Sequence, residues 1–252
     1  MTVLTIAGRE LGGLFRSPLA WVVLAAAQLV TGFIFLLHLE TYLQVQPKLV
    51  ESGAGPGVTA FLLPRLYGAT AMIHVFAIPL LTMQLVAGER RQGTLPLLLG
   101  APVSTVEIIA GKFLGLLGVL LAMVALTALM PLSLAFFTDL DGGAVAMAVA
   151  GHLLFVAGAS ALGLYLSTVT REPTIAATAT LGILLALLLL GEWGRTLGEP
   201  WAGLLGWPAP ATHLTPFLSG LFDSAATSFF VLFTGLFATF AVRRLDNDRL
   251  QR

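Results

Sequence analysis

Cysteine is absent from this 252-residue chain, and charged residues make up only 10% of it. Without cysteine the chain has no disulfides, no thiolate metal ligands and no cysteine nucleophile. Soluble domains carry roughly a quarter charged residues, so this low charge, together with 57% hydrophobic residues, excludes an ordinary soluble domain. Thirteen basic residues balance thirteen acidic ones, which removes the basic signature of a nucleic-acid-binding protein. The composition predicts a polytopic membrane protein.

Motifs for phosphate binding and metal chemistry are also missing. The chain has no G-x-x-x-x-G-K-[ST] sequence, so it lacks the backbone loop on which many ATPases hold nucleotide phosphates. It has no H-E-x-x-H motif, and its four histidines are scattered, so no metal site is predicted. Ser160 lies in a run of small residues from Gly158 to Gly163. Because Ala161 stands where a G-x-S-G motif needs glycine, we favour close helix packing over an intramembrane serine protease.

Six apolar stretches approach or exceed the roughly 20 residues that a helix needs to cross a bilayer. They cover residues 19–39, 67–87, 113–137, 144–169, 174–191 and 225–242. If both termini are cytoplasmic, only Lys48, Arg65 and Arg195 of the thirteen basic residues fall outside, as the positive-inside rule favours. We therefore predict an all-α polytopic membrane protein with six transmembrane helices in one domain over residues 1–252, and with cytoplasmic N- and C-termini.

Three segments outside these stretches have their own patterns. Residues 3–16 predict an amphipathic helix in the membrane interface, with an apolar face formed by Leu4, Ala7, Leu11 and Phe15. The alternative is an extension of the first span, but Ser17-Pro18 favours a break. The glycines and proline of the outer loop 40–66 predict an irregular, mobile middle. The outer segment 192–224 is apolar yet interrupted by four prolines, which predicts short re-entrant or interfacial helices before the last span.

The inner loop over residues 88–112, GERRQGTLPLLLGAPVSTVEIIAGK, is the most informative stretch. Its pattern predicts a short helix over residues 95–99 that ends at Gly100 and Pro102. Ser104 and Glu107 have the spacing of a capping box that begins the third span. Such a helix is either a connector resting in the lipid headgroups or a docking surface for a cytoplasmic partner, and the pattern alone leaves both open.

The spans contain few polar side chains that could carry function. None of their interiors holds an acid, lysine or arginine, which argues against a carrier driven by titration within the membrane. The polar candidates either make interhelical hydrogen bonds or line a translocation path, and they are Gln28, His74, Gln84 and His152.

The inner loop resembles that of a known family. Residues 88–95, 97–99 and 101–104, with Glu107 and Gly111-Lys112, are similar to the cytoplasmic loop of ABC-2 type transporter permeases. Residues 15–21 and the approach to the last span, with His213, Phe217, Gly220, Asp223 and Phe229-Phe230, resemble the small six-helix branch that includes gliding-motility and nitrous-oxide-reductase-maturation permeases.

The resemblance implies a coupling helix that docks on a separate ATP-binding subunit. The residues it assigns to this contact are Glu89, Arg90, Arg91, Gly93, Thr94, Leu95, Leu98, Pro102, Ser104 and Glu107. It also implies a homodimer with two ATPase subunits, in which the first and fifth spans meet their symmetry mates. Small residues suited to that contact are Ala25, Ala26, Ala27, Ala176, Ala177 and Ala179. By the same resemblance, this chain binds no cofactor, ATP and Mg²⁺ bind to the partner, and the complex lies in the bacterial cytoplasmic membrane.

These expectations favour the membrane subunit of an ATP-driven exporter over an enzyme. One alternative is an ATP-driven mechanical complex that transmits force without a transported substrate. A stand-alone channel or secondary carrier is a further alternative, against which the absence of intramembrane charge argues.

Overall fold

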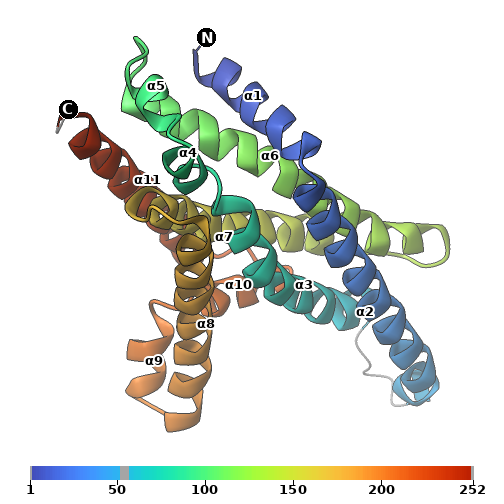
Figure 1. The fold of residues 1–252 in the computed structure, drawn as a ribbon. Coiled ribbons are helices and arrows are strands. Elements are labelled where there is room, and N and C mark those ends of the chain that lie inside the picture. Colours follow the sequence, from blue (N-terminus) through green and yellow to red (C-terminus); the bar gives the residue numbers. More distant parts are fainter. Residues whose placement is uncertain (1, 52–56, 251–252) are drawn as a thin grey trace.

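A computed structural model describes residues 2–51 and 57–250, which form helices and connecting turns without a β-strand (Figure 1). Six helices are long and apolar enough to cross a membrane, so the predicted number of spans is confirmed. The helices are α1 (Thr2–Arg16), α2 (Pro18–Glu51), α3 (Val58–Thr82), α4 (Ala87–Arg91), α5 (Leu95–Leu99), α6 (Thr105–Leu132), the 3₁₀ turn η1 (Ser133–Phe136), α7 (Gly142–Val169), α8 (Pro173–Leu197), α9 (Trp201–Gly206), α10 (Pro210–Leu218) and α11 (Ser224–Leu250).

Several helices extend well beyond the apolar stretches that mark them in the sequence. Helix α2 continues to Glu51 and α3 begins at Val58, so the predicted long outer loop 40–66 is wrong. The polar residues after position 39 continue the helix past the apolar stretch, and the rings of Tyr42 and Phe61 pack 5.3 Å apart between α2 and α3. The predicted mobile middle of this loop falls largely on residues 52–56, which lie outside the described residues.

The centre of the bundle is formed by α3 and α7, whereas α2, α8 and α11 lie at its periphery (Figure 1). Leucine, isoleucine and valine side chains of α3, α6 and α7 make up much of the buried core. In the outer segment, α9 and α10 are the short helices predicted from its prolines. Helix α10 packs against α7, where a Cβ on Gly151 would lie only 2.3 Å from Cβ of Phe217.

The N-terminal helix α1 is present as predicted, and it ends before Ser17-Pro18. Two residues of its predicted apolar face, Leu11 and Phe15, pack against the core together with Ile6, whereas Leu4 is 74% exposed. The reason is a row of glycines on α6 that accepts α1 at close range. A Cβ on Gly115 would lie 2.7 Å from Cβ of Glu10 and 2.9 Å from the carbonyl oxygen of Ala7.

Candidate functional site

The backbone between α3 and α6 turns at a glycine. Helix α4 ends through a glycine in the left-handed region, Gly93, with φ of +69°. The next amide, of Thr94, donates a hydrogen bond of 2.9 Å to the carbonyl oxygen of Glu89. This bond is typical of a Schellman helix end, which favours glycine at that position. The predicted helix over residues 95–99 is confirmed as α5.

The predicted capping box at the start of α6 is confirmed as well. The Glu107 amide donates to Oγ of Ser104 at 3.2 Å, and the Ser104 amide donates to Oε2 of Glu107 at 2.9 Å. These two bonds satisfy helix-start amides. We call residues 87–107 the candidate coupling segment.

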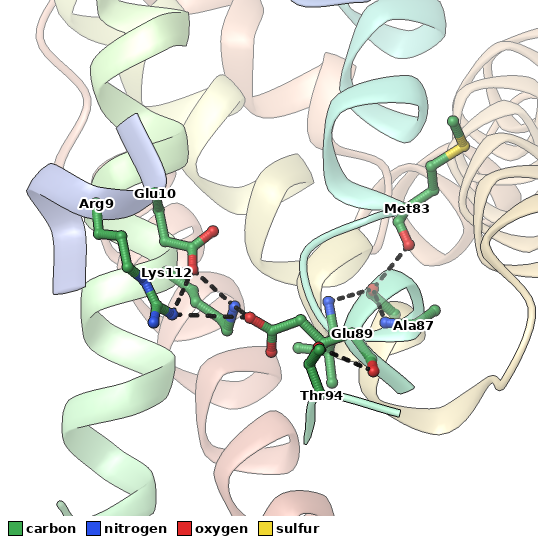
Figure 2. Close-up of polar contacts among 9 residues, drawn as sticks. Arg9, Glu10, Met83, Ala87, Glu89, Thr94 and Lys112 are labelled. Atoms are coloured by element: carbon green, nitrogen blue, oxygen red, sulfur yellow. Dashed lines mark hydrogen bonds and ion pairs between the residues drawn. The ribbon is translucent and has the colours of Figure 1, made fainter. Parts of the chain in front are cut away.

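A serine on α7 holds the beginning of the candidate coupling segment. Oγ of Ser167 accepts hydrogen bonds from the amides of Val86 (3.1 Å) and Ala87 (3.0 Å). The same hydroxyl donates to the carbonyl oxygen of Met83 at 3.1 Å (Figure 2). One side chain therefore satisfies the backbone where α3 passes into α4. Sequence reasoning missed this role, because Ser167 lies about 80 residues along the chain.

A buried lysine joins the segment to α1 (Figure 2). Nζ of Lys112 lies 2.7 Å from Oε1 of Glu89 and 2.9 Å from Oε1 of Glu10. The Lys112 side chain is only 1% exposed, and a buried charge is tolerated when it is paired. Arg9 completes the network at 3.2 Å from Glu10 and 3.8 Å from Glu89. The Glu89 carboxylate predicted for docking is thus bound largely inside its own chain.

The end of α11 holds the other side of the segment. Arg90 donates to Oδ2 of Asp248 at 2.5 Å and to the carbonyl oxygen of Thr168 at 2.8 Å. Arg249 donates to the carbonyl oxygen of Val103 at 3.0 Å. Arg90 is therefore also engaged within the chain, although the resemblance assigned it to a partner contact.

Only some of the residues assigned to the ATPase contact are exposed on the candidate coupling segment. Of the predicted residues, Leu95 is only 3% exposed and supports the fold, whereas the exposed ones are Arg91, Gly93, Thr94, Pro102 and Ser104. Leu97 is 77% exposed and lines a hollow between α1 and α5, but it was not among the predicted contact residues. Because α5 is apolar along its whole length, its sequence gives no periodicity from which to tell which leucine faces outward.

The four polar candidates in the spans do not all lie together within the chain. Gln28 on α2 donates to the carbonyl oxygen of Met123 on α6 at 2.9 Å, which fits interhelical hydrogen bonding. Gln84 is exposed beside α1. Only His74 and His152 come together, with ring centroids 4.9 Å apart.

The alanines predicted for a dimer contact differ in how exposed they are. Ala25 and Ala26 are exposed on α2, and Ala177 and Ala179 are half-buried on α8. Two of the predicted positions, Ala27 and Ala176, are 5% and 0% exposed. Ala27 nevertheless lines a surface hollow beside Ala26, so the α2 alanines remain the predicted dimer surface.

Comparison with known families finds a family model that matches residues 4–240, from the first turn of α1 to the middle of α11. The matching model is described as ABC-2 family transporter protein. No curated protein matches the chain.

Proposed function

Because the chain belongs to the ABC-2 family of transporter proteins, we propose that it is the membrane-spanning permease subunit of an ATP-driven exporter. ATP and Mg²⁺ bind to a separate cytoplasmic ATPase in this proposal, and two permease chains assemble with two ATPase chains in a bacterial cytoplasmic membrane. The family match over nearly the whole chain carries the proposal, and it favours a transporter over an intramembrane enzyme.

The form of the candidate coupling segment supports the docking role. It is tied to α7 through Ser167, to α6 and α1 through Lys112, and to α11 through Arg90. A displacement of the candidate coupling segment by the ATPase therefore moves several helices together, since packed protein interiors are stiff. Its outward face includes apolar Leu97, which is 77% exposed and lines a hollow together with Leu98 and Thr94, so a partner can contact it.

The direct test is purification of the full-length chain in mild detergent from membranes that also contain its ATPase. We expect a stable complex whose partner carries the phosphate-binding loop that this chain lacks, with ATPase activity sensitive to vanadate. Recovery of the chain without an ATPase from every mild detergent would contradict the proposal.

Leu97 gives a sharper test of the docking face. Leu97→Ser should leave the thermal stability of the permease nearly unchanged, because exposed substitutions usually stay within about 0.5 kcal/mol. If Leu97 enters a partner groove, the change should weaken ATPase binding about tenfold, which is about 1.4 kcal/mol. The measurement is the affinity between the purified subunits.

The matched control is Leu221→Ser, at an exposed leucine (64%) after α10, on the opposite side of the bundle. It should change neither stability nor affinity. Equal affinities for all three proteins would remove α5 from the docking surface.

A further inference from the structure

Three buried polar side chains meet inside the bundle, where α3 faces α7. Tyr67 and His74 lie on α3, and His152 lies on α7. The ring centroids of Tyr67 and His152 are 5.5 Å apart, and those of His74 and His152 are 4.9 Å apart. None of the three is more than 1% exposed, so the cluster is closed off from the surface of the chain.

Four polar atoms of this cluster have no hydrogen-bond partner among the described residues. They are the Tyr67 hydroxyl oxygen, Nε2 of His74 and both ring nitrogens of His152. Nδ1 of His74 lies 2.9 Å from the carbonyl oxygen of Thr70. Since a carbonyl oxygen only accepts, Nδ1 carries the hydrogen, and Nε2 of the neutral ring is an acceptor. Polar atoms buried in protein interiors are nearly always hydrogen-bonded, so these four indicate a bound species.

One water molecule would give a partner to three of these four atoms and leave the protonated nitrogen of His152 without an acceptor. The Tyr67 hydroxyl can donate to the water oxygen, and the two water hydrogens can reach Nε2 of His74 and the unprotonated nitrogen of His152. A buried water typically makes about three such bonds. A metal ion fits less well, because the described residues contain no group of three or more His, Cys, Asp or Glu that could hold one.

We propose that Tyr67, His74 and His152 form a binding site for a water molecule that bridges α3 and α7. In a bilayer, helices are held together by packing and by interhelical hydrogen bonds, because lipid is as apolar as the helix surface. The water fixes the pairing of α3 and α7 in the core of the bundle, while Ser167 fixes it at the end next to α4. The site is a property of this chain alone and does not depend on an ATPase partner.

Nuclear magnetic resonance of the full-length chain in lipid bilayers tests the site directly. The chain has only four histidines, so ¹⁵N-labelled ring nitrogens can be assigned by replacing one histidine at a time. Magnetisation transfer from water protons should reach Nε2 of His74 and one nitrogen of His152. Tyr67→Phe should reduce that transfer several-fold, whereas Tyr165→Phe, outside the cluster, should not.

Thermal unfolding provides a second measurement. If one water joins the rings, Tyr67→Phe and His152→Phe each lower Tm, and the double variant lowers Tm by less than the sum. If the cluster is dry, removing an unpartnered polar atom raises Tm or leaves it unchanged, and the effects add. If the wild-type spectrum shows no magnetisation transfer from water to the rings of His74 and His152, the proposal is overturned, even where a variant fails to fold. Saturable binding of one Zn²⁺ per chain that displaces the water signal would overturn it as well.

Discussion

Lys112 shows how one residue can join three parts of the chain. Its ammonium group is almost completely buried between Glu10 of α1 and Glu89 of α4, and both carboxylates are themselves mostly buried. If the lysine is removed, the two carboxylates lose their buried cation and keep only the more exposed Arg9 beside them. Breaking a fully buried ion pair costs about 3–5 kcal/mol, and a hydrogen bond to a charged group contributes about 1.5–3 kcal/mol.

We therefore expect Lys112→Met to lower the free energy of unfolding by about 2–4 kcal/mol, within the range of these two values, and to loosen α1. Thermal unfolding in detergent measures the first effect, and hydrogen exchange of the α1 amides measures the second. Lys48→Met is the matched control, because Lys48 is the only other lysine and is exposed. Equal stabilities of the two variants would contradict a structural role for the buried ion pairs.

Glu89 illustrates the limit of interpretation residue by residue. The sequence places it correctly at the exit of the second span, where a docking contact is reasonable. Its bond to Lys112 depends on the approach of α6, which no local pattern predicts. A loss of ATPase coupling in Glu89→Ala would mix a weaker fold with a weaker partner contact, so Leu97 is the cleaner position for testing docking.

At the scale of the element, α1 is held by close packing as well as by charge. Gly111, Gly115 and Gly118 follow one side of α6, and an added Cβ at each would lie under 3.0 Å from an atom of α1. Glycines at this spacing let two helix backbones approach closely. Helix α1 is thereby a packed part of the bundle, beside the candidate coupling segment.

Gly115→Ala should lower the free energy of unfolding by about 1–3 kcal/mol, because an added methyl group overpacks a close contact. The same substitution at Gly182 is the control, since a Cβ there meets no atom within 4 Å. Gly182→Ala should be neutral or stabilising by about 0.5–1 kcal/mol, because alanine favours a helix over glycine. Chemical or thermal unfolding compares the two, and destabilisation of both variants alike would contradict a specific glycine contact.

Elements governed by local rules were predicted well from the sequence. The six spans, α5 and the capping box each follow from neighbouring residues. Features that depend on distant partners were not predicted, among them the outward position of Leu4 and the role of Ser167. The outer extension of α2 was missed because hydropathy marks the membrane-crossing part of a helix and not its polar continuation.

At the scale of the whole molecule, charge gathers at one end of the bundle. Arg9, Arg90 and Lys112 meet their acidic partners on the side where α4, α5 and both ends of the chain lie (Figure 1). Our orientation places this end in the cytoplasm, since basic residues favour that side. The same end carries the exposed face of the candidate coupling segment, so an ATPase would meet it without crossing the membrane.

The predicted homodimer can be tested at this scale, because the chain has no natural cysteine to interfere. Ala26→Cys on α2 should form a disulfide between copies under mild oxidation, because Ala26 is exposed and small enough for close helix approach. Ala148→Cys is the control, because Ala148 lies on the central helix α7 and is 0% exposed, and it should not cross-link. The readout is the fraction of covalent dimer from native membranes. Cross-linking from Leu121→Cys on α6 (54% exposed), with none from Ala26→Cys, would place the dimer contact on another face of the bundle.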